Sequence, residues 1–95
     1  MMEKDFEKAL LNDPQITSTK SVASRMAKAR KAEEILGVSL DITVSDDERM
    51  YESLLVLQQH DNPSSAPLQN ALRKYYKFKN QREFPRLRDY RKSHP

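Results

Sequence analysis

Residues 67–80 read PLQNALRKYYKFKN, a pattern that predicts an amphipathic α-helix. Apolar side chains recur every three or four positions, which places them on one helix face. Pro67 suits the first turn of a helix, and Ser65 just before it is a candidate N-cap. The predicted apolar face consists of Leu68, Ala71, Leu72, Tyr75 and Phe78.

Two helices are predicted toward the N-terminus. The first spans about residues 3–11 and ends at Asn12-Asp13-Pro14, because proline disfavours a helical conformation in the residue before it. The second begins at Thr17-Ser18, which offers an N-cap, and ends before Gly37, where a left-handed C-cap is expected. Its predicted apolar face consists of Val22, Met26, Ala29 and Leu36.

A further helix is predicted over residues 45–60. Ser45 and Glu48 have the spacing of a capping box, and the four consecutive apolar residues 54–57 predict that this helix is the most buried element. Residues 38–44 alternate between apolar and polar side chains, which is a strand signal. Because a single strand would have no partner, we expect an extended connection there.

These patterns predict an all-α fold, a small single-domain bundle of four helices with a basic C-terminal extension. The bundle comprises residues 1–80 and the extension residues 81–95. The sequence leaves open whether the extension is a short helix beginning at Pro85 or a disordered arm. Its apolar anchors, Phe84, Leu87 and Tyr90, suit either docking on the bundle or ordering only on DNA.

Positive charge is concentrated in the C-terminal part of the chain. Residues 68–95 contain nine basic and two acidic residues, whereas residues 1–67 contain eight basic and twelve acidic residues. Residues 18–32 add a second basic strip, with five basic and no acidic residues. Concentrated positive charge attracts polyanions, and the commonest polyanion in a cell is nucleic acid. Two basic helices would frame one groove if their polar faces point the same way.

The candidate nucleic-acid contacts lie on these polar faces and in the extension. Lysine and arginine supply phosphate contacts, and the amides of Gln69 and Asn70 suit an adenine edge. Basic faces that are merely solvated are the alternative interpretation. The candidates are Lys20, Arg25, Lys28, Lys31, Gln69, Asn70, Arg73, Lys74, Lys77, Lys79, Arg82, Arg86 and Arg88.

Two adjacent tyrosines belong to the predicted apolar stripe or its edge. Tyr75 lies in the stripe and is predicted to be core. Tyr76 lies at its edge, where packing at the boundary of the core is favoured over stacking on a base or a sugar.

The sequence predicts no enzyme, cofactor or metal site. His60 beside Asp61 is not a catalytic dyad, because catalysis needs a base oriented toward a nucleophile in space. The acidic triplet 46–48 is interpreted as a helix start. The chain has no cysteine and no apolar run of membrane-spanning length, so we expect a cytoplasmic protein with no membrane contact.

Two stretches together resemble a known family. The first is SVASRM leading into AEEILG and SLD, residues 21–26, 32–37 and 39–41, and the second is NALRKYYKF, residues 70–78. The helix order over residues 17–80 resembles the SAM-like modules at the N-terminus of tyrosine recombinases, and also modules appended to some bacterial nucleases. The resemblance implies DNA clamping through basic helices, but no nucleophilic tyrosine, because the recombinase catalytic domain is absent. The residues that it implicates are Lys20, Arg25, Lys28, Arg73 and Lys77.

The predicted function is therefore non-catalytic binding of nucleic acid, with DNA favoured, as in a small phage, plasmid or mobile-element protein. The alternative is a protein-interaction module, an adaptor or inhibitor that docks on a larger partner. That alternative relies on an exposed apolar patch at Leu55 and Val56, and it loses its best anchor if both are buried. The oligomeric state is left open.

Overall fold

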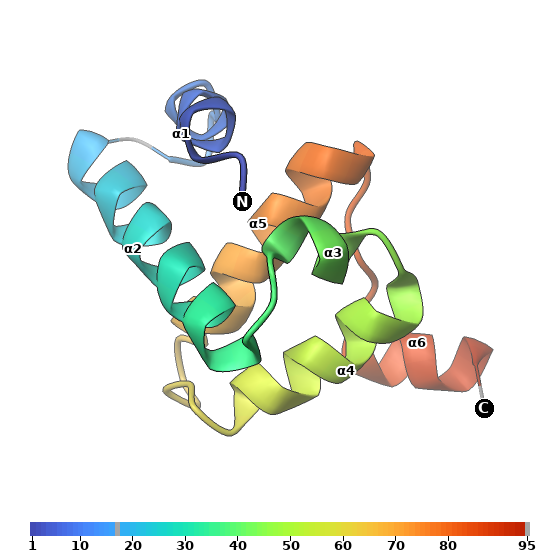
Figure 1. Ribbon diagram of the computed structural model, residues 1–95. Coiled ribbons are helices and arrows are strands. Elements are labelled where there is room, and N and C mark those ends of the chain that lie inside the picture. The colour runs from blue at the N-terminus through green and yellow to red at the C-terminus, as the bar shows by residue number, and fades with distance from the viewer. Residues whose placement is uncertain (17, 95) are drawn as a thin grey trace.

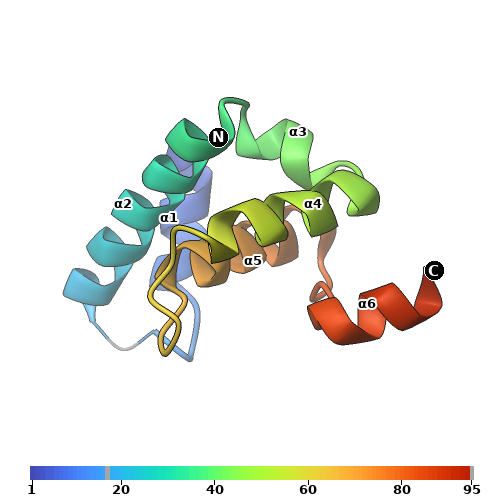
Figure 2. The same cartoon turned by 90° about the horizontal axis from the view of Figure 1, so that it is seen from below.

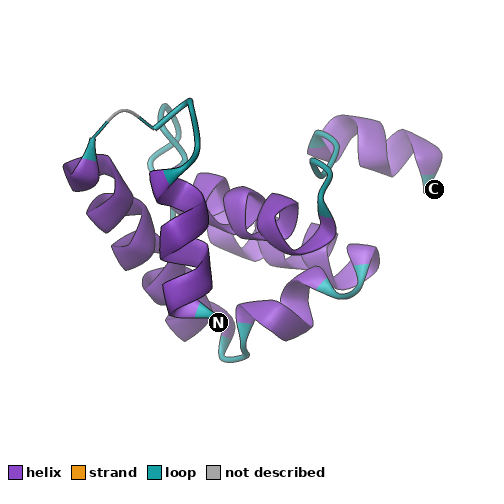
Figure 3. Cartoon of the chain, turned by 90° about the horizontal axis from the view of Figure 1, so that it is seen from above, coloured by secondary structure: helices purple, strands orange, loops and turns teal. Residues whose placement is uncertain are grey.

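Six helices form in the part of the chain that the structure describes, residues 1–16 and 18–94 of a computed structural model (Figure 1). The described residues contain no strand (Figure 3). The all-α prediction is confirmed, but the predicted four helices are six, because residues 40–44 and 87–93 are helical as well. The helices are α1 (Glu3–Leu11), α2 (Thr19–Leu36), α3 (Leu40–Val44), α4 (Asp47–Gln58), α5 (Pro67–Asn80) and α6 (Leu87–Ser93).

Helix α5 is the centre of the fold and contacts α1, α2, α3 and α4. Its apolar face is buried as predicted, apart from Phe78, which is only partly buried. The most extensive contact is the one between α2 and α5. Figures 1 and 2 show α2 and α6 at opposite ends of the molecule, with α4 and α5 between them.

Helix α4 is less buried than predicted. Leu54 and Leu57 are buried, but Leu55 is only partly buried and Val56 is 41% exposed. An apolar run that surrounds a helix is fully buried only if neighbours cover every side, and here part of it faces solvent. The central helix is α5 instead, which contacts four other helices and in which even Tyr76 at the edge of the stripe is completely buried.

Residues 38–44 do not form the predicted extended connection. Ser39 begins helix α3 as its N-cap, with its Oγ accepting a hydrogen bond from the amide of Asp41 at 3.2 Å. Leu40 and Val44 are buried, at the i, i+4 spacing of a helix face, whereas Ile42 between them is 49% exposed. The apolar residues of this segment fit both the alternation of a strand and the i, i+4 spacing of a helix. Packing against the rest of the fold selects the helix.

The caps agree with the prediction at α2 and correct it at α4. Ser18 accepts a hydrogen bond from the amide of Ser21 at 3.1 Å, and Gly37 ends α2 with a φ of 71°. Thr17, also predicted at this cap, lies outside the described residues. The N-cap of α4 is Asp46 rather than Ser45, because the Ser45 hydroxyl donates to the last turn of α3 instead.

Ser65 is not the cap of α5. The N-cap position is occupied by Ala66, which has a φ of 45° and no capping side chain. The carboxylate of Asp61 accepts hydrogen bonds from the first amides of α5, those of Leu68 and Gln69, at 2.7 and 2.9 Å. A negative charge is favourable at this end of the helix dipole.

The basic extension docks on the bundle. Phe84 and Tyr90 are buried, and their ring centroids lie 5.2 Å apart in a cluster that includes Tyr76 and Tyr51. The last helix begins at Leu87 rather than at the predicted Pro85. Of the alternatives that the sequence left open, the described residues therefore adopt the docked helix.

Candidate nucleic-acid interface

Two adjoining hollows of about 500 and 260 Å³ lie along α5, and Arg25 of α2 and Asn70 of α5 line both of them. The smaller hollow lies between α2 and the start of α5, and the larger one is also lined by the segment that follows α5. We call them together the cationic groove. Among the described residues that line it, Glu83 is the only acidic one. The polar faces of the two basic helices therefore meet, which the sequence could not establish. The basic residues that line the groove are Arg25, Lys28, Arg73, Lys74, Lys77 and Arg86.

The buried stripe of α2 determines which of its basic side chains reach the groove. Val22, Met26 and Ala29 pack into the core, and Arg25 and Lys28 lie beside this stripe on the side that faces α5. Lys20 and Lys31 do not line the groove, and Lys31 lies 3.9 Å from Glu34 of its own helix. One strip of five basic residues is thus divided between the groove and the outer surface.

Arg73 is held in place by the chain that follows α5. Its Nη1 donates to the carbonyls of Phe84 and Pro85 at 2.9 and 3.1 Å, and its guanidinium carbon lies 5.9 Å from the centre of the Phe84 ring. Burial lowers the pKa of Arg73 from its ordinary value. The docked extension therefore positions a basic side chain from the central helix.

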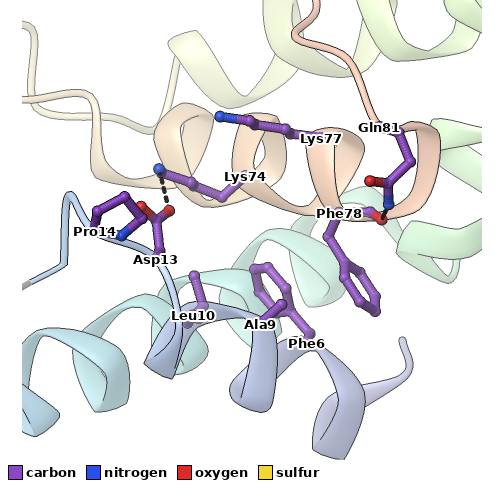
Figure 4. Close-up of a pocket in the computed structure, with 9 residues that line it drawn as sticks. All are labelled: Phe6, Ala9, Leu10, Asp13, Pro14, Lys74, Lys77, Phe78 and Gln81. Carbon is purple, nitrogen blue, oxygen red and sulfur yellow. Dashed lines mark hydrogen bonds and ion pairs between the residues drawn. The ribbon is translucent and has the colours of Figure 1, made fainter.

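Lys74 and Lys77 differ in how their charges are used. The Lys74 Nζ donates to the carboxylate of Asp13 at 2.6 Å and to Gln15 at 2.9 Å, and its side chain is only 15% exposed (Figure 4). The hydrogen bond from Lys74, and after it the one that the backbone amide of Gln15 donates to the same carboxylate at 2.9 Å, lower the pKa of Asp13. The Lys77 side chain is 49% exposed and lies 3.8 Å from the exposed Glu83. Lys77 therefore presents its charge to solvent.

A third hollow, of about 310 Å³, lies between α1 and α5 and is also lined by Lys74 and Lys77. Figure 4 shows the two lysines above the rings of Phe6 and Phe78, all of which line this hollow. Gln81, which ends α5 with a φ of 60°, lies at its far end and donates to the carbonyl of Phe78. This hollow is an apolar continuation of the surface beyond the Lys74–Asp13 pair.

The remaining predicted contacts are not gathered at the groove. Lys79 lies 3.5 Å from Asp41, and Arg82 lies 3.3 Å from Asp47 and above the ring of Tyr76. Gln69 and Arg88 are absent from the groove lining. Asn70 lines the groove, but its Nδ2 donates to the carbonyl of Ser65 at 2.8 Å.

The two tyrosines of α5 hold the fold together. Tyr75 donates to Asp41 and accepts from the amide of Met2, and Tyr76 donates to Asp47 at 2.7 Å. The core prediction for Tyr75 is confirmed, and Tyr76 is buried just as completely. Burial, with the hydrogen bond to Asp47, raises the pKa of Tyr76 to about 12. Neither ring is accessible for stacking on a base.

Sequence reasoning missed two hydroxyl groups at the groove. Ser21 and Ser24 line the smaller hollow together with Arg25 and Lys28. Each serine precedes one of these basic residues by four positions, a spacing that places both on one helix face. That spacing is the signal that could have identified them.

The described residues contain no group of three acidic or histidine side chains that could hold a metal ion. Within the same part of the chain, no helix is both long and apolar enough to cross a membrane. Comparisons with protein-family models, with curated proteins and with solved structures found no match.

Proposed function

We propose that the cationic groove binds the phosphate backbone of a nucleic acid, DNA in the first place, without catalysis. The observation that carries this proposal is the gathering of six basic residues and one acidic residue in one hollow surface between α2 and α5. Phosphate contacts from lysine and arginine supply most of the affinity in sequence-independent binding. A groove between two helices can follow a strand and make several such contacts.

Three of these basic residues are best placed to contact phosphates. Arg25, Lys28 and Arg86 have no acidic side chain within 4.0 Å among the described residues. They need not break an existing ion pair to bind a phosphate. Lys79 and Arg82 do not belong to this surface, because they are absent from the groove lining and pair with Asp41 and Asp47.

The proposal agrees in part with the resemblance to recombinase modules. Four of the residues that the resemblance implicates line the groove, and Lys20 does not. The resemblance itself stays a prediction, as does the SAM-like assignment of the fold. The residues shared by the proposal and the resemblance are Arg25, Lys28, Arg73 and Lys77.

The test is fluorescence anisotropy with a labelled duplex of about 20 base pairs, at about 50 and 200 mM salt, with a single strand for comparison. Replacing Arg25 and Lys28 together by alanine should weaken binding about tenfold and reduce the salt slope by about 2. The matched control is Arg49→Ala with Lys92→Ala, which removes the same charge from exposed positions on α4 and α6. The control should retain most of the affinity.

Two results would contradict the proposal. Absence of duplex binding by the unaltered protein at the lower salt would show that its basic surface is only solvated. Equal loss of affinity in the groove variant and in the control would show that net charge, rather than the groove, attracts the duplex.

The alternative function, a protein-interaction module, has narrower support. Val56 is 41% exposed and Leu55 is only partly buried. The apolar patch on which this alternative relies is therefore still at the surface in part. Val56→Asp should leave duplex affinity unchanged if the groove is the functional surface.

A further inference from the structure

Arg73 has the features of a built anion site rather than of a solvated surface charge. It is only partly exposed, and Nη1 is fixed by two carbonyls of the segment that follows α5. The contact with the Phe84 ring further limits the positions that the guanidinium can take. An arginine that is already ordered loses little conformational freedom when it binds a ligand.

The other edge of this guanidinium is open. Nε and Nη2 of Arg73 have no hydrogen-bond partner among the described residues. These atoms are not sealed in the interior, since no buried side-chain nitrogen or oxygen in the described ranges lacks a partner. Arg73 lines the larger hollow, so its free donors are accessible there. Two parallel donors on one guanidinium edge match two oxygens of a single phosphate.

The surroundings favour a ligand with more than one negative charge. Arg25, Lys77 and Arg86 line the same hollow of about 500 Å³, and Glu83 is the only acidic residue in its described lining. A phosphate monoester carries up to two charges and three strong acceptor oxygens. An internal phosphodiester carries one charge and has a sugar on each side, which hinders its approach to a partly buried arginine.

We propose that Arg73, with its basic neighbours, forms a site for the terminal phosphate of a nucleic-acid strand. This inference rests on the proposed function and adds the chemical group that the groove recognises. The exposed basic residues attract the backbone, and the fixed edge of Arg73 binds the strand end. The protein then prefers phosphorylated ends to hydroxyl ends.

The experiment compares two duplexes of one sequence, with 5′-phosphate or 5′-hydroxyl ends and the label on an internal base. At about 100 mM salt, the phosphorylated duplex should bind about tenfold more tightly. Arg73→Lys keeps the charge but loses the paired donors, so it should abolish this preference for the phosphorylated duplex. Arg88→Lys, on an exposed residue outside the groove, should retain both the preference and the affinity for the hydroxyl duplex.

A second variant keeps the test valid if Arg73→Lys does not fold. Arg86 is exposed and has no acidic partner among the described residues, so Arg86→Ala should fold normally. Because Arg86 lines the same hollow, its loss should reduce the preference for phosphorylated ends at least about threefold. An unchanged preference in Arg86→Ala would contradict a site at this place.

The outcomes separate this inference from the proposed function. Equal affinity for both duplexes would overturn the terminal-phosphate site and leave backbone binding intact. A different outcome is that neither duplex binds, whereas inorganic phosphate raises the unfolding temperature of the unaltered protein but not that of Arg73→Lys. The ligand would then be a small phosphorylated molecule, and both nucleic-acid proposals would be wrong.

Discussion

Basic side chains lie on both sides of α5, and the two sides differ in how completely acidic residues pair with them. Toward α3 and α4, Lys79 and Arg82 pair with Asp41 and Asp47. Toward α2, Lys74 pairs with Asp13 and Lys77 lies 3.8 Å from Glu83. On the same side, Arg25 and Lys28 of α2 have no acidic partner among the described residues. Basic residues paired with acids serve the fold, and those left unpaired are available for a ligand. The net charge of a segment therefore does not identify a binding surface.

The pairing also explains the uneven charge distribution along the chain. Four acidic residues of the N-terminal two thirds contact basic or phenolic groups of the C-terminal third, so part of the excess charge is used in folding. Interactions of this kind join distant segments and stabilise the docking of the C-terminal part. They link Lys74 to Asp13, Lys79 to Asp41, Arg82 to Asp47 and Tyr90 to Glu48.

The largest effect is expected from Asp41→Asn, on the paired side. The Asp41 carboxylate accepts a hydrogen bond from Tyr75 and lies 3.3 Å from the Met1 ammonium and 3.5 Å from the Lys79 amine. Its replacement should lower the free energy of unfolding in urea by about 2–3 kcal/mol.

The control for this variant is Glu34→Gln, whose side chain is 74% exposed and which should change stability by less than about 0.5 kcal/mol. Duplex affinity should not fall in Asp41→Asn under conditions where the protein is folded. A loss of affinity in the folded variant would mean that the α3 side also contacts the nucleic acid, and the contrast between the two sides would be wrong.

A smaller effect is expected from Tyr76→Phe. The change removes the hydrogen bond to Asp47 and leaves the ring in its buried position, so stability should fall by about 1 kcal/mol. Duplex affinity should stay the same, because a buried ring cannot stack on a base. Weaker binding without loss of stability would show that Tyr76 reaches the nucleic acid after all. Urea unfolding and anisotropy on the same preparation separate these results.

The sequence correctly predicted the helices whose apolar spacing fits a helix and does not fit a strand. The stripe from Leu68 to Tyr75 and the stripe from Val22 to Ala29 both became buried faces of long helices. Residues 38–44 were misinterpreted because their apolar positions fit a strand and a short helix alike. The choice depended on the packing of Leu40 and Val44, which is tertiary information.

The chemical type of the candidate site could be predicted from the sequence, but its position in the fold could not. The residue types and the two basic strips are visible in the sequence, and their helical positions indicate a common face within each strip. The meeting of Arg25 with Arg73 depends on how α2 lies against α5. The neutralisation of Lys79 and Arg82 depends on acidic residues more than thirty positions away in the chain. Neither relation can be derived from periodicity.

The smallest expected effect concerns Asp13 and the dependence of stability on pH. Lys74, foremost, lowers the pKa of Asp13, and hydrogen bonds from Tyr75 and Met1 lower the pKa of Asp41 although burial acts to raise it. A carboxyl whose pKa is lowered by folding stabilises the protein above its unfolded pKa, and this stabilisation is lost as the pH falls through the folded pKa. The unfolding temperature should therefore decrease from about pH 5 downward.

Asp13→Asn should make this decrease shallower and cost less than about 1 kcal/mol at pH 7. Asp5→Asn, at an exposed position of α1, is the control and should preserve the slope. Asp13→Asn also releases the Lys74 amine, which lines the groove, from its only acidic partner among the described residues. Asp13→Asn should therefore bind duplex slightly more tightly while being less stable. A parallel fall of affinity and stability would mean that the Lys74–Asp13 pair supports the groove rather than withholding a charge from it.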